Sequence, residues 1–133
     1  MYYTLTLNPA LDYVVKLSQL NIGNTNRSEG EELRFGGKGI NVSYILSQLG
    51  VDNIALGFIA GFTGDELQHL LKFNGIKTDF IRLNEGNTRI NIKIKGQKET
   101  EINASGPVID ETALEKLFKK LDVLKSGDTL VLS

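Results

Sequence analysis

The segment Gly36-Gly37-Lys38-Gly39-Ile40-Asn41 decides how this chain is read. A helix is predicted to begin at these glycines, because apolar residues at the spacing of one helix face follow them: Val42, Ile45, Leu46 and Leu49. Glycines let a ligand approach the backbone, and the first turn of a helix offers unpaired amides and a positive dipole end. Lys38 adds a charge and Asn41 a hydrogen-bonding group, so the segment predicts a site for an anionic, hydroxyl-rich ligand. A flexible glycine turn that binds nothing is the alternative that this segment alone leaves open.

Composition narrows the class of protein. The chain has 133 residues, of which 41% are hydrophobic and 23% charged, so one folded domain is expected rather than disorder. The net charge of -1 gives no electrostatic reason to expect nucleic acid or an anionic membrane as a partner. The absence of cysteine and the single histidine, His69, argue against disulfides, thiolate chemistry and most zinc sites, so no metal site is expected. His69 itself reads as a surface residue. No secretory signal or membrane-length apolar run is recognised, and a cytoplasmic protein is expected.

Buried strands alternate with helices along the chain. The near-continuous apolar run over 53–60 is typical of a strand in a parallel sheet that is covered on both faces. Further strands are expected at 3–7, 77–83 and 129–132. Thr63 and Glu66 match a capping box, so a helix is expected to start there and to bury Leu67, Leu70 and Leu71. A third helix should begin at Asp110, with its buried stripe at Leu114, Leu117, Phe118, Leu121 and Leu124. This order predicts an α/β fold with three layers, a sheet between two layers of helices.

A second kind of β structure interrupts that pattern. Over 88–95 apolar and polar residues alternate strictly, with Ile90, Ile92 and Ile94 on one face and Arg89, Asn91, Lys93 and Lys95 on the other. This predicts a half-exposed antiparallel strand that turns at Gly96-Gln97 into a partner over 99–103. With shorter strands near 13–17 and 27–35, it is expected to form a small sheet that stands off the main layer. The isoleucine face packs either on the core or against a second subunit, and the sequence does not separate the two.

Several spaced motifs carry a resemblance to a known family. They are Thr6–Asp12, Asn26–Ser28, Gly36–Ser43, Gly57-Phe58, Gly61–Gly64, Thr88–Lys93, Glu99–Asn103 and Gly106-Pro107. In this order they resemble the start of the ribokinase-like (PfkB) carbohydrate kinases, and within them the branch of 1-phosphofructokinases and tagatose-6-phosphate kinases. The resemblance implies a ribokinase-like α/β/α sandwich with a protruding β lid made of strands near 13–17, 27–35 and 88–103. It also implies that residues 1–133 are the N-terminal, sugar-binding portion. The final strand, with nothing after it, leads to the same expectation of a part of a longer chain.

The resemblance also implies an activity. The whole protein is expected to use ATP and Mg²⁺ to convert fructose 1-phosphate to fructose 1,6-bisphosphate. A tagatose-6-phosphate kinase is the alternative, and a non-catalytic sugar-phosphate-binding module is the alternative from another class. The family's Gly-Ala-Gly-Asp segment, which supplies the anion hole and the catalytic aspartate, does not occur in these 133 residues. No catalytic, nucleotide-binding or metal-binding residue is therefore expected in this chain, and alone it is expected to be inactive.

The same resemblance assigns substrate-binding roles by residue. Asp12 would hold sugar hydroxyls, because a carboxylate accepts from neighbouring OH groups. Arg89 would clamp the existing phosphate from the lid, since a guanidinium binds phosphate oxygens in pairs, and Arg27 is a second candidate for that role. The glycine segment would contact the sugar and its phosphate through Gly36, Gly37, Lys38 and Asn41. Taken alone, Asp12 is also readable as a turn residue and Arg89 as a solvated strand residue. The expected partners are a phosphorylated ketohexose and a second copy of the chain bound through the lid.

Overall fold

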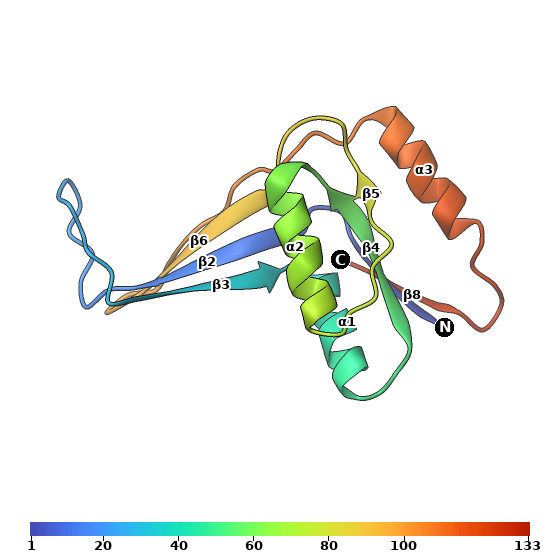
Figure 1. Cartoon of the computed structure of the whole chain (residues 1–133), viewed down its shortest axis with the longest axis horizontal. Helices are drawn as coiled ribbons and strands as arrows, with labels where there is room; N and C mark the ends of the chain where they lie inside the picture. Colours follow the sequence, from blue (N-terminus) through green and yellow to red (C-terminus); the bar gives the residue numbers. More distant parts are fainter.

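Two four-stranded sheets organise the chain, and the computed structural model describes all of residues 1–133 (Figure 1). The main sheet has the order β5-β4-β1-β8, and all its strands run parallel. Its strands are β1 (Tyr2–Thr6), β4 (Asn53–Ile59), β5 (Ile81–Arg82) and β8 (Thr129–Leu132). The strand expected over 77–83 is thus shortened to β5, preceded by an isolated parallel bridge between Thr78 and Ala55. None of the helices is long and apolar enough to cross a membrane.

Helices cover both faces of the main sheet. On one face, Ala55 and Ile59 of β4 share a core cluster with residues of α1 (Lys38–Gln48) and α2 (Gly61–Phe73). On the other face, Leu56 and Phe58 pack in a cluster with residues of α3 (Glu111–Leu121). The alternate side chains of β4 therefore enter two different cores, as the apolar run in the sequence predicted. The expected three-layer α/β/α sandwich is confirmed.

The second sheet projects away from this sandwich and is called the lid here (Figure 1). It has the order β3-β2-β6-β7. Its strands are β2 (Ala10–Lys16), β3 (Gly30–Gly36), β6 (Arg89–Lys95) and β7 (Thr100–Ile102). The antiparallel pairing of β6 with β7 is confirmed, but β6 also pairs parallel with β2, which the sequence did not predict. The parallel pair arises because β2 and β6 both leave the main sheet from the same edge and run outward together.

The start of α2 differs from the prediction. The helix begins at Gly61 with Ala60 as its N-cap, so Thr63 lies inside the first turn and the predicted capping box is wrong. Thr63 is buried, and its hydroxyl donates to the carbonyl of Thr88 at 2.7 Å. The Thr88 amide in turn donates to the Ala60 carbonyl at 2.9 Å, and the Thr88 hydroxyl accepts from the Ala60 amide at 3.0 Å. The Thr63 side chain therefore bonds to the carbonyl of Thr88, which is distant in sequence, instead of capping the helix. This bond ties α2 to the base of β6.

Two helices bury a different stripe from the expected one. In α1, Ile45 is 55% and Leu49 71% exposed, whereas Ile40 and Ser43 face the sheet. Ser43 shares a buried 2.7 Å hydrogen bond with Thr4 of β1, so a polar pair occupies part of this interface. In α3, Leu117 is buried as expected but Phe118 is exposed. The N-cap of α3 is confirmed, since the Asp110 carboxylate accepts from the Ala113 amide at 2.7 Å.

The Thr63 hydrogen bond generates a stability test. Thr63→Val keeps the shape of the side chain but leaves the buried Thr88 carbonyl without its hydroxyl donor, so the free energy of unfolding should fall by about 1–3 kcal/mol. Glu66→Ala is the matched control, because a true capping box would make Glu66 equally important. We expect that control to stay within about 0.5 kcal/mol of the parent in urea unfolding. A larger loss from Glu66→Ala than from Thr63→Val would restore the capping box.

Candidate functional site

A pocket of about 250 Å³ lies where the polar face of the lid meets the start of α1. Its walls come from β2, β3, β6, β7 and α1. The lining residues are Asp12, Val14, Arg34, Phe35, Asn41, Lys93, Ile94, Lys95, Glu99, Thr100 and Glu101. Asp12 and Asn41, which were predicted from distant segments of the sequence, are thus brought together. The pocket combines carboxylate, amide and cationic groups, which suits a polar ligand that carries negative charge.

The Asp12 carboxylate is buried and bonded on both oxygens. Asn91 donates from Nδ2 to Asp12 Oδ1 at 3.1 Å, and Lys93 Nζ lies 3.1 Å from Oδ2. The hydrogen bond with Asp12 raises the pKa of the Lys93 ammonium above its ordinary value, and partial burial only partly opposes this. Lys93 is also 3.6 Å from Glu101. β6 therefore supplies the buried carboxylate with an amide and a cation, the partners that such a group needs away from water.

Gly36 leaves the space that the Asp12 side chain occupies. A Cβ atom at position 36 would lie 2.7 Å from Asp12 Oδ1, closer than such contacts ever are. Gly36 ends β3 opposite Ala10 of β2, and its φ angle is not positive. The absence of a side chain, rather than an unusual backbone angle, is therefore what this position needs. The first glycine of the motif acts by making room for the carboxylate.

The start of α1 is less open than the sequence predicted. Gly37 is the N-cap, with a φ of 129° that disfavours other residues. The amides of Gly39 and Ile40 were expected to be unpaired, but they donate to the Ser133 hydroxyl at 2.9 Å and to the Thr6 hydroxyl at 3.2 Å. Ser133 directly follows β8 and Thr6 ends β1, so these hydroxyls fix the helix on the main sheet. Lys38 begins the helix with an exposed side chain that forms no ion pair.

The two predicted phosphate-binding arginines do not line the pocket. Arg89 is half-buried and donates to two backbone carbonyls, from Nε to Asn8 at 3.1 Å and from a terminal nitrogen to Ala104 at 3.4 Å. Arg27 is exposed and lies beyond Gly30, where β3 begins, at the outer end of the lid. The roles of Arg89 and Arg27 in binding substrate stay predictions.

Two pocket residues, Arg34 and Lys93, were not singled out from the sequence, nor was Asn91, which bonds to Asp12 behind the pocket. The signal was present, because the alternation over 88–95 placed Asn91 and Lys93 on the same face as Arg89. That face was read as solvent-exposed, but Asn91 is only 7% exposed, whereas Ile92 on the opposite face is 36% exposed. Both ends of the Asn91 amide are used, since its Oδ1 accepts from the Ala104 amide at 3.2 Å. The polar side of β6 is therefore the inner side at the base of the lid.

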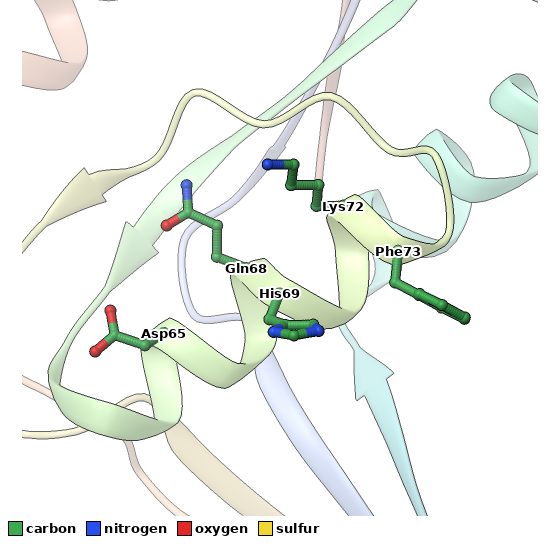
Figure 2. Close-up of a pocket in the computed structure, with 5 residues that line it drawn as sticks. All are labelled: Asp65, Gln68, His69, Lys72 and Phe73. Atoms are coloured by element: carbon green, nitrogen blue, oxygen red, sulfur yellow. The ribbon is translucent and has the colours of Figure 1, made fainter.

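A second hollow, of about 620 Å³, lies along the outer side of α2. It is lined by Asp65, Gln68, His69, Lys72 and Phe73 (Figure 2). Figure 2 shows these side chains spreading outward from one helix rather than converging on a point. Asp65 is already paired with Arg82, and His69 is exposed, as expected. This hollow offers no set of converging groups for catalysis. The chain also has no cluster of three or more histidine or carboxylate side chains that could hold a metal ion.

Comparison with known proteins finds relatives along the whole length of this chain. A family model described as pfkB family carbohydrate kinase matches residues 5–133. The 1-phosphofructokinase of Borreliella burgdorferi is 47% identical over 134 residues, covering 100% of this chain and 43% of that protein. The D-tagatose-1-phosphate kinase of Bacillus licheniformis is 40% identical over 133 residues, covering 100% of this chain and 43% of that protein. The chain thus spans less than half the length of these relatives.

Solved structures show the same fold. Phosphofructokinase-2 from Escherichia coli, crystallised with fructose-6-phosphate, superposes with a TM-score of 0.91 at 27% identity, over 98% of this chain and 44% of that one. A tetrameric inhibited form of the same enzyme gives a TM-score of 0.89.

The packing of Gly36 against Asp12 can be tested on stability. Gly36→Ala should lower the free energy of unfolding by about 1–3 kcal/mol, because the added methyl group must displace the buried carboxylate from its partners. Gly30→Ala, at the other end of β3, is the matched control, since its Cβ would make only an ordinary 3.7 Å contact with Lys16. Chemical denaturation of both variants measures the difference. Equal effects at the two positions would contradict the role given to Gly36.

Proposed function

Because the chain belongs to the pfkB family of carbohydrate kinases, we propose that it forms the sugar-binding portion of a kinase that phosphorylates fructose 1-phosphate to fructose 1,6-bisphosphate. The observation that carries this proposal is the lid pocket, in which a buried carboxylate and the Asn41 amide lie beside cationic side chains. Such a pocket matches a ligand with several hydroxyl groups and one phosphate. The sequence similarity to a 1-phosphofructokinase supports the choice of sugar.

Five of the predicted residues contact the substrate in this proposal. Asp12 accepts hydrogen bonds from two neighbouring sugar hydroxyls, and Asn41 contacts the sugar from the first turn of α1. Gly37 lets the sugar approach the backbone, and Lys38 provides an exposed charge for the phosphate. Arg89, at the base of β6, contributes to phosphate binding, for which it would have to release a backbone carbonyl. These residues bind and orient the substrate, and orientation is a large part of phosphoryl-transfer catalysis.

The chemical step is assigned to residues outside this chain. ATP supplies the phosphoryl group and Mg²⁺ neutralises its developing charge, but no residue here is assigned to either. Without an anion hole or a catalytic aspartate, the 133-residue chain should bind the sugar phosphate without turning it over. ATP and phosphorylated sugars are metabolites of the cytoplasm, where we place this activity. A tagatose-6-phosphate kinase remains the alternative substrate assignment, and a binding module without chemistry is the alternative function.

Calorimetry with fructose 1-phosphate and tagatose 6-phosphate tests the proposal. We expect tighter binding of fructose 1-phosphate, and a loss of about 10-fold or more for Asp12→Asn, because hydrogen bonds to a charged group are the strong ones. Asp52→Asn is the control, since that exposed carboxylate pairs with Lys77 far from the pocket. Preference for tagatose 6-phosphate would favour the alternative kinase.

Turnover separates a kinase from a binding module. ADP release with magnesium-ATP and fructose 1-phosphate should be absent from the 133-residue chain and present in a protein whose chain continues into the nucleotide-binding portion. Turnover by the 133 residues alone would contradict the assignment of the chemical step. If the longer protein released no ADP with either fructose 1-phosphate or tagatose 6-phosphate, its assignment as a kinase of these sugars would be contradicted.

We also propose that two copies of the chain associate through their lids. The outer face of the lid carries apolar side chains that are 36–55% exposed. They are Tyr13, Leu33, Ile90, Ile92 and Ile102. They come from all four strands and form one face, because paired residues on neighbouring strands point the same way. A continuous apolar face on a protruding sheet is typical of a surface that a partner covers. Escherichia coli phosphofructokinase-2 has a tetrameric form, which is consistent with self-association of proteins with this fold.

The oligomeric state tests this surface. Ile92→Lys places a charge at the centre of the apolar face and should shift the chain from dimer to monomer in sedimentation velocity. Ile45→Lys, at a more exposed isoleucine on α1, should leave the dimer intact. A parent chain that is monomeric at high concentration, or a control that dissociates as readily, would contradict the lid interface.

A further inference from the structure

Lys93 differs from the other cations near the pocket in the carboxylate with which it pairs. Arg34 is bonded to Glu32 at 2.6 Å, and Lys95 lies 3.7 Å from Glu99. The partner of Lys93, by contrast, is Asp12, the carboxylate assigned to the sugar hydroxyls. Its side chain is partly buried and lines the pocket.

Binding a sugar changes the surroundings of that ammonium group. A hydroxyl that donates to Asp12 Oδ2 competes with Lys93 for the same oxygen, since Oδ1 already accepts from Asn91. An ammonium group that loses its anionic partner inside a pocket is destabilised. Glu101, at 3.6 Å, is the remaining carboxylate and is largely exposed. A neutral sugar therefore leaves the lysine poorly compensated, whereas a sugar phosphate brings a new anion.

We propose that Lys93 determines specificity for phosphorylated sugars: it neutralises Asp12 in the empty pocket and binds the phosphate of the substrate when sugar hydroxyls occupy Asp12. The inference rests on the proposed function and extends it to a residue separate from Arg89, whose guanidinium is held by backbone carbonyls. In the empty pocket Asp12 raises the pKa of the Lys93 ammonium, so this group is charged when the substrate arrives. Its flexible side chain lets one cation serve two anions in turn.

The discrimination between two ligands is the first test. Lys93→Met should weaken binding of fructose 1-phosphate by about 10- to 100-fold, the effect of removing a charged hydrogen-bond partner. Binding of unphosphorylated fructose should stay the same or tighten, because no ammonium group then competes for Asp12. Lys93→Arg should retain most of the preference for the phosphorylated sugar. Lys16→Met removes a positive charge from an exposed position of the lid outside the pocket and should change either affinity by less than about 3-fold.

Two results would overturn the proposal: equal losses for both ligands, or unchanged binding of fructose 1-phosphate by Lys93→Met. The parent chain can also be titrated with each ligand while NMR monitors the Lys93 side chain. This test does not depend on whether a variant folds. Fructose 1-phosphate and fructose should shift the Lys93 signals differently, because only the phosphate replaces the anionic partner, and identical shifts from both would also overturn the role. None of these results would contradict the binding of sugar phosphate by the parent chain. A parent chain that binds neither ligand would overturn the proposed function, and the role of Lys93 with it.

Discussion

A buried carboxylate at the base of the lid constrains the rest of the site. The Asp12 carboxylate needs polar partners away from water, and β6 brings Asn91 and Lys93 against its two oxygens. That requirement fixes the parallel register of β2 and β6, in which Asp12 lies opposite Asn91. It also explains the glycine at the end of β3, since a methyl group at Gly36 would occupy the space of the carboxylate. Three strands that are far apart in sequence thus meet around one side chain.

The sequence predicted the layers of the fold better than it predicted which faces are covered. The run over 53–60 identified β4 as buried on both sides, because no other environment suits an unbroken apolar strand. In α1, however, the apolar spacing selected Ile45 and Leu49, which are exposed, over Ser43, which is buried against Thr4. Periodicity shows which residues share a face but not what lies opposite it. The capping box failed for a related reason, since Thr63 bonds to a carbonyl that is distant in sequence.

The same limit applies to the site. Asp12 and Asn41 could be predicted, because each follows a recognisable local motif and both line one pocket. Asn91 and Lys93 could not be assigned, although their alternation was correct, because their role depends on the pairing of β6 with a strand nearly eighty residues earlier. For Arg89, the residue type suggested a role in binding that its contacts in the structure do not show. Its residue type suits phosphate, but the structure uses two of its donors to hold Asn8 and Ala104.

These backbone bonds suggest how the lid is held in place. Arg89 joins the segment after β1 to the segment after β7, and Asn91 bonds the same Ala104 residue on one side and Asp12 on the other. The Thr63 and Thr88 bonds fix the base of β6 to α2 as well. The base of the lid is therefore anchored to the sandwich by side chains, whereas the side-chain bonds of its outer half, such as those of Ser18 with Glu29 and Lys95 with Glu99, stay within the lid. Anchoring at the base holds Asp12 in position while the apolar face stays available to a partner.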